Sequence, residues 1–215
     1  MRTLPTWKAI ATAALALPAA ATAATWDLDP AHTSVQFSVR HLMVSNVRGE
    51  FGKVSGTVQA DEADPSRSKI EAEIDAASVD TRIEKRDNHL RSADFLDVAK
   101  YPKITFVSTK IEPAGAEHFK VSGDLTLHGV TRPVVLDVQG PSPEIKDPWG
   151  KTRAGAQATT KINRKDFGLT WNQALDAGGV AVGDEVTITI DVEATKRAAV
   201  GAETSLRQTS AGERK

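Results

Sequence analysis

The strongest constraint on the fold is the alternation of apolar and polar residues along four segments of the chain. In residues 119–127, apolar or small residues occupy every second position and polar residues stand between them. Residues 35–39, 70–74 and 186–192 show the same period. Because successive side chains of a β-strand point to opposite faces, this pattern predicts strands with one dry and one wet face.

Weaker strand patterns cover four further segments, and turn signals separate them. The segments are residues 48–60, 104–111, 133–139 and 151–163. Turns are expected at Asp64-Pro65, at His128-Gly129, in residues 141–148 and at Gly178-Gly179. About eight strands with mostly short connections favour antiparallel pairing. The expected class is therefore all-β, as a closed barrel or a sandwich.

A small barrel either fills its interior with side chains or holds one small ligand. Aromatic residues make up only 5% of the chain, and many expected inward positions carry Val, Ile or Ala, so the composition favours a cavity. The side chains expected to line it are Val35, Phe37, Val39, Ile70, Ile74, Phe106, Phe119, Val121, Leu125, Leu127, Leu136, Val186, Ile188 and Ile190.

A charged helical segment interrupts the strands in residues 80–109. A short helix is expected near residues 81–98, with Thr81 and Glu84 as a T-x-x-E capping box. Its apolar face, Ile83 and Leu90, is narrow, which suits a helix that covers an opening. Two interpretations of its polar side chains stay open: a solvated face with weak charge pairs, or a lid that recognises a polar head such as a phosphate. The residues of this expected polar mouth are Arg86, Asp87, His89 and Arg91.

The N-terminus has the features of a cleavable signal peptide over residues 1–23. Arg2 and Lys8 give a basic start, residues 9–21 are weakly apolar, and Ala21-Thr22-Ala23 is a small-x-small cleavage signal. The chain has no cysteine, which excludes disulfides, thiol catalysis and a lipid anchor at the cleavage point. We therefore expect a periplasmic protein with one barrel domain at 24–196 and a disordered tail at 197–215.

Charge and residue spacing argue against several other functions. The formal net charge is −1, and no basic face indicates a nucleic-acid partner. The five histidines lack ligand spacing, so no metal site is expected. His32 and Ser34 lack a nucleophile-elbow motif, and we assign no catalytic residue. Arg164 and Asp166 are expected to form a structural pair at a strand end.

Several motifs together resemble the YceI-like family of periplasmic lipid- or polyisoprenoid-binding proteins. They are DPAHTSVQF from Asp29 followed by RHL from Arg40, RDNHL from Arg86, YPKITF from Tyr101, GDLTLHGVT from Gly123 and RKDFG from Arg164. The resemblance covers residues 25–194, in order. It implies a lipocalin-like eight-stranded barrel with an elongated apolar cavity, a bound isoprenoid or long-chain lipid, and no catalytic mechanism.

From these observations we predict a periplasmic carrier that sequesters a polyisoprenoid or other long-chain amphiphile. Quinones, polyprenyl phosphates and fatty acids or amides stay open as ligands, and a transient membrane-protein partner is a candidate for loading the barrel. Two alternatives remain. One is an enzyme acting on the same lipid through the region of His32 or His89. The other is a stress-linked interaction module with a filled barrel.

Overall fold

The computed structural model describes residues 23–176 and 178–198, which form a strand-rich domain with one α-helix. The expected signal peptide lies outside the described residues except for Ala23, and so does the expected tail apart from Arg197 and Ala198. None of the described helices is long and apolar enough to cross a membrane.

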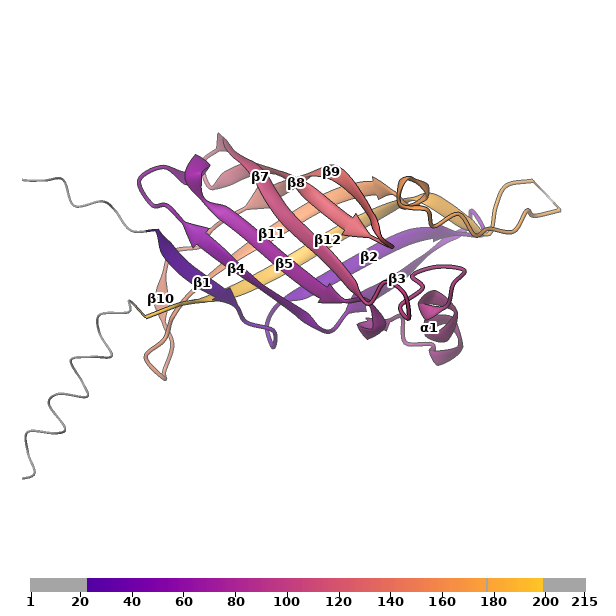
Figure 1. The fold of residues 1–215 in the computed structure, drawn as a ribbon, viewed down its shortest axis with the longest axis horizontal. Helices are drawn as coiled ribbons and strands as arrows, with labels where there is room; N and C mark the ends of the chain where they lie inside the picture. Colours follow the sequence, from indigo (N-terminus) through magenta and orange to yellow (C-terminus); the bar gives the residue numbers. More distant parts are fainter. Residues whose placement is uncertain (1–22, 177, 199–215) are drawn as a thin grey trace, which may run out of the picture.

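The strands form an antiparallel barrel with eight positions around its wall (Figure 1). Three of these positions are each made by two strands in succession: β1 and β2 share one position, β3 and β4 the next, and β5 and β6 the third. The pairings show this, because β4 pairs with β1 and β5, while β3 pairs with β2 and β6. The strands are β1 Ala24–Leu28, β2 Ser34–His41, β3 Ser45–Phe51, β4 Val54–Ala60, β5 Lys69–Asp75, β6 Val79–Asp80, β7 Lys103–Gly115, β8 His118–Leu127, β9 Val130–Gln139, β10 Ile145–Lys146, β11 Thr152–Asn163 and β12 Val182–Lys196.

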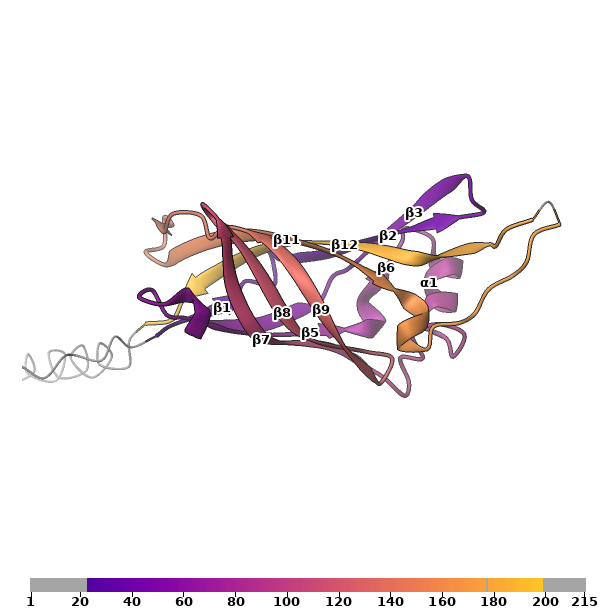
Figure 2. The same ribbon diagram turned by 90° about the horizontal axis from the view of Figure 1, so that it is seen from above.

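The long strand β12 closes the barrel. One of its edges pairs with β11 over the full stretch from Arg153↔Thr195 to Asn163↔Glu185. Its other edge pairs with β2 and then, near its end, with β1. The expected all-β barrel is thereby confirmed. The start of β1 and the end of β12 lie at one end of the barrel, and the helix lies at the other (Figures 1 and 2).

The strand expected at residues 48–60 is two strands. The break falls at Gly52 and Lys53, whose backbone N–H groups donate to the Ser78 carbonyl and hydroxyl, at 3.3 Å and 3.2 Å. At this point the chain passes from β3, which pairs with β2, to β4, which pairs with β1. Strand β1 was not predicted, because its five residues, ATWDL, directly follow the expected cleavage site and carry little periodicity.

The helix α1, Glu84–Arg91, is shorter than expected, and the predicted capping box of Thr81 and Glu84 is wrong. The helix is preceded by Ile83, which makes no side-chain cap. The Thr81 hydroxyl instead donates to the carboxylate of Asp87, at 2.5 Å, and so is not available to the helix N-terminus. After the helix, turns lead to Phe95 and Leu96, which are buried.

Short 3-10 helices at Pro65–Arg67, Ala76–Ser78 and Arg164–Phe167 complete the fold. The last of these packs beside β9 and β12 and ends at Gly168, whose φ of 79° is the left-handed conformation that glycine adopts without strain. One buried cluster includes Phe95, Leu96 and Phe167, and Leu90 of α1 packs against it. A second cluster, formed by Phe106 and Ile111 of β7 and Val121 of β8, has side chains of the neighbouring strands β5 and β9 packed against it.

Candidate ligand-binding cavity

The interior of the barrel contains a cavity of about 810 Å³. Its wall is mostly aliphatic and is supplied by alternate residues of the strands. On β12, for example, Val186, Ile188, Ile190 and Val192 line the cavity, while the residues between them do not. A volume of this size falls in the range of about 300–1,000 Å³ that is typical of small-molecule sites.

Most of the side chains expected from the sequence meet at this cavity. Those that line it are Val35, Phe37, Val39, Ile70, Ile74, Phe106, Leu125, Leu127, Leu136, Val186, Ile188 and Ile190. Phe119 and Val121 do not line it. Val121 is almost completely buried against Phe106 and Ile111, and Phe119 packs beside them, so these two side chains belong to a packed cluster on the inner face of β8 and not to the cavity wall.

Sequence reasoning missed several lining residues for identifiable reasons. Ala156, Ala158 and Ile162 line the cavity from β11, whose alternation is blurred by Gly155 and by inward Thr160. Leu169 and Trp171 also line it, but they come from the loop after Arg164–Phe167, where no strand or helix period marks an inward side.

The cavity reaches the surface at the helix end of the barrel. Exposed residues of its lining gather there: Arg40 and Leu42 from the end of β2, Ile83 and Lys85 at the start of α1, and Gln173 from the loop before β12. Figure 2 shows the β2–β3 hairpin, α1 and this loop at the same end. We call this end the mouth.

Two of the four residues of the expected polar mouth line the cavity. The Arg86 guanidinium donates to the hydroxyl and to the carbonyl of Thr81, both at 2.7 Å. His89 Nε2 lies 2.8 Å from the Asp94 carboxylate. The His89 ring also meets Phe95 and Trp171 edge-on, with ring centroids 5.0 Å and 4.9 Å away. These contacts fix Arg86 and His89 at the inner edge of the mouth.

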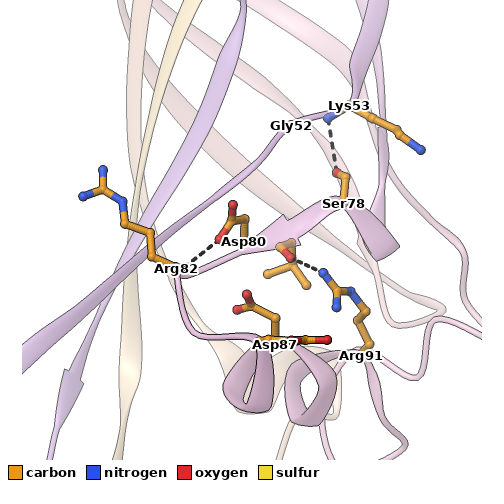
Figure 3. Close-up of a pocket in the computed structure, with 9 residues that line it drawn as sticks. Gly52, Lys53, Ser78, Asp80, Arg82, Asp87 and Arg91 are labelled. Atoms are coloured by element: carbon orange, nitrogen blue, oxygen red, sulfur yellow. Dashed lines mark hydrogen bonds between the residues drawn. The ribbon is translucent and has the colours of Figure 1, made fainter.

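Asp87 and Arg91, the other two, face away from the cavity into a shallow surface depression (Figure 3). The buried Asp87 carboxylate accepts from the Thr81 backbone N–H at 2.9 Å as well as from its hydroxyl. Arg91 donates to the carbonyls of Ala77 and Val79, at 2.8 Å and 2.7 Å. Both residues therefore fasten α1 to the segment before it.

Arg164 is a buried cation in the cavity wall. The predicted pair between Arg164 and Asp166 does not form. The Arg164 guanidinium donates to the carbonyls of Leu169 and Trp171, at 2.5 Å and 2.9 Å, and lies 3.3 Å from Asp184. Burial lowers the pKa of Arg164, and the nearby Asp184 charge acts in the opposite direction. Because its donors bind backbone carbonyls, Arg164 holds the Trp171 loop against β12.

Asp29, His32 and Glu193 place potential metal-ligand atoms within 4.8 Å of one another, near the end opposite the mouth. The Arg153 guanidinium already occupies this cluster, at 2.6 Å from Asp29 and 2.5 Å from Glu193. Hydrogen bonds from Arg153 and His32 hold the pKa of the Asp29 carboxyl well below its usual range. The cluster is therefore an ion-pair network in which an arginine supplies the cation.

Sequence comparisons relate this chain to known proteins. A family model described as a YceI-like domain matches residues 26–194. A UPF0312 protein of Vibrio cholerae is 41% identical over 159 residues, which are 73% of this chain and 84% of that protein.

Solved structures share the fold. The Campylobacter jejuni YceI protein is 35% identical and superposes with a TM-score of 0.62, covering 74% of this chain and 90% of that one. A domain of Saccharophagus degradans, described as a polyisoprenoid binding domain implicated in plant cell wall breakdown, has a TM-score of 0.58. It covers 80% of this chain and 98% of that one, and at 20% identity the likeness concerns the fold alone.

Proposed function

Because the chain belongs to the YceI-like domain family, we propose that it is a binding protein that holds a long-chain amphiphile inside its barrel. A polyisoprenoid, such as a quinone or a polyprenyl lipid, is the ligand we favour. The observation that carries the proposal is the aliphatic cavity of about 810 Å³ that opens at one end of the barrel.

Burial of the ligand's tail supplies the binding energy in this proposal. Each buried methylene contributes about 0.8 kcal/mol, so a five-carbon prenyl unit supplies roughly 3–4 kcal/mol before losses. The loss of translational and rotational freedom on association costs about 4–15 kcal/mol, and ordering of the chain adds to this cost. At this rate about two units offset a cost at the low end of the range and about four or five units offset one at the high end, so affinity should depend mainly on the length of the tail that fits.

The polar head of the ligand would stay at the mouth. Arg86 and His89 lie at its inner edge, and Arg40 and Lys85 line it further out. Cationic and hydrogen-bonding groups in this position suit a phosphate, a carboxylate or a quinone oxygen. An apolar tail inside and a polar head outside define an amphiphile as the ligand class.

The cellular role that fits this site is transport or sequestration of the amphiphile in the periplasm. The signal-peptide pattern of residues 1–23 supports export, and enclosure of the tail would keep an insoluble lipid in solution between membranes. A membrane protein that loads or unloads the barrel remains a candidate partner.

Binding accounts for this site better than either alternative. A filled barrel does not agree with the cavity. An enzyme acting through His89 would need that imidazole to reach a reacting atom, whereas the ring is paired with Asp94 and packed between Phe95 and Trp171. His32 is exposed and bound to Asp29, at 3.0 Å, and does not line the cavity.

Lipid extraction and native mass spectrometry test the proposal. We expect protein purified from the cells that produce it to carry one long-chain amphiphile per chain, released by organic solvent. A protein that is empty when isolated and also binds no added prenyl or acyl chain would overturn the proposal.

A further inference from the structure

We infer that the mouth end of the barrel docks onto an anionic lipid surface, with the tip of the β2–β3 hairpin entering the interfacial layer. The inference rests on the proposed function, because a carrier of a membrane amphiphile must collect or release its cargo at a bilayer. The docking surface comprises the hairpin tip Leu42, Met43 and Val44, the exposed Ile83, and the cations Arg40, Arg82 and Lys85.

The first observation is that the tip is apolar and faces solvent. Met43 is 50% exposed, Val44 74% and Ile83 51%, and Leu42 beside them is also exposed. Leu42 and Ile83 belong to the lining of the cavity mouth as well. Large apolar side chains that gather around an opening mark an interaction site more strongly than scattered ones do.

The second observation is the backbone of the tip. Leu42 and Met43 have φ values of 48° and 60°, the left-handed region that costs free energy for residues other than glycine. The turn is nevertheless held firmly, by Val44 N–H to the His41 carbonyl at 3.0 Å and by Leu42 N–H to the Ala181 carbonyl at 2.9 Å. A tight hairpin turn of this kind is ordinarily built from Asn and Gly, so Leu and Met are energetically costly residues at these two positions.

The third observation is that cations lie beside these side chains: Arg40 and Lys85 line the mouth together with Leu42 and Ile83, and Arg82 directly precedes Ile83 in the chain. Arg40, Arg82 and Lys85 are exposed, and Arg40 donates to the Met43 carbonyl at 2.8 Å, which places its guanidinium at the tip. Glu84, Asp80 and Asp176 are exposed acids at the same end, and Asp80 accepts a hydrogen bond from the Arg82 backbone. Basic residues beside interfacial apolar residues favour anionic headgroups.

A competing surface exists at the opposite end of the barrel. There Trp149, 81% exposed, lies between Lys146 and Lys151 near the exposed Ile145. None of these four residues lines the cavity, so docking through them would not bring the opening to the membrane. The position of the mouth therefore favours the hairpin end.

Sedimentation with lipid vesicles tests the inference on the purified protein. Vesicles of phosphatidylcholine alone are compared with vesicles containing about 30% phosphatidylglycerol, at low and high salt. The variants are Met43→Ser/Val44→Ser at the tip and Arg82→Gln/Lys85→Gln at the two cations that flank Ile83 in the chain. Val107→Ser/Val135→Ser is the matched control, because these outward valines of the barrel wall are 47% and 51% exposed. Trp149→Ser reports on the opposite end.

We expect the protein to prefer the anionic vesicles and to lose that preference at high salt. The tip variant should bind at least about tenfold more weakly, and the cation variant about 10–30-fold more weakly. The wall variant and Trp149→Ser should bind like the parent protein. The altered side chains are exposed, so circular dichroism should show an unchanged fold for each variant.

Three results would overturn docking at the mouth. In the first, the parent protein does not bind anionic vesicles at all. In the second, the wall variant or Trp149→Ser weakens vesicle binding as much as the tip variant does. In the third, the tip variant changes only the oligomeric state. The last result would assign the tip to a second copy of the chain. Native mass spectrometry of the same samples separates the two proposals: a long-chain amphiphile retained without vesicle binding contradicts docking alone, whereas absence of any such ligand contradicts the proposed function.

Discussion

At the scale of single residues, Gly123 allows two strands of the barrel wall to pack closely. A Cβ added to Gly123 would lie 2.4 Å from the Phe106 ring and 2.6 Å from the Val107 carbonyl oxygen. We expect Gly123→Ala to lower the free energy of unfolding by about 1–3 kcal/mol, because Phe106 and the backbone of β7 must both shift. Urea unfolding measures this. Gly52→Ala is the control, since nothing lies within 4 Å of its added Cβ, and an equal loss in both variants would contradict the packing argument.

Also at this scale, the pH dependence of stability should reveal the Arg153 network. The Asp29 pKa is lowered from 3.8, chiefly by its hydrogen bond with Arg153, and the Asp147 pKa is lowered by the same guanidinium. A carboxylate with a depressed folded-state pKa stabilises the fold above its unfolded pKa, and this contribution is lost as pH falls through the folded value. Arg153→Gln should therefore lower Tm at neutral pH.

Below pH 3.8 the difference in Tm between the parent protein and Arg153→Gln should shrink as both carboxyls become protonated. Thermal unfolding between about pH 7 and pH 2 measures it. Lys146→Gln, which changes an exposed lysine outside this network, is the control. A Tm difference that stays constant with pH would show that Arg153 acts by packing alone.

At the scale of elements, the inward face of β11 limits the space available to a ligand. Ala158 is buried, lines the cavity and pairs with Ile190 of the neighbouring strand β12. Ala158→Phe should fill part of the cavity and weaken binding of the longest prenyl chains about tenfold or more, while the free energy of unfolding falls by no more than about 1–3 kcal/mol. Thr159→Phe, exposed on the outer face of the same strand, is the control for titrations with prenyl alcohols. Equal weakening in both variants would place the ligand outside the barrel.

Local patterns predicted some elements well and others poorly, for physical reasons. The four alternating segments correspond to β2, β5, β8 and β12, because a strand with one wet face carries its period in the sequence. The division between β3 and β4 depends on Ser78, a residue distant in sequence that binds Gly52 and Lys53. The shorter helix has a similar cause, since Thr81 binds Asp87 and Arg86 in place of capping.

At the scale of the whole molecule, the strand patterns predicted an all-β fold but did not by themselves predict that the sheet closes into a barrel. The pairing of β12 with β1 and β2 joins segments far apart in the chain, and alternation alone does not distinguish a barrel from a sandwich. The cavity was predictable in character, because small aliphatic residues at inward positions leave space. The residues of the mouth could be predicted only in part. The RDNHL segment indicated the correct end of the barrel, but the sequence does not show that Asp87 and Arg91 point away from the opening.

The central claim is that the cavity binds an amphiphile through its tail, and a chain-length series tests it most directly. Dissociation constants are measured for prenyl alcohols that share one head group and differ only in the number of five-carbon units. We predict that affinity rises by at least roughly tenfold per added unit, because ordering of the chain offsets part of the roughly 3–4 kcal/mol that each unit supplies, and then levels off once the tail fills the cavity. Affinity that does not change with chain length, or no binding at any length, would contradict the claim.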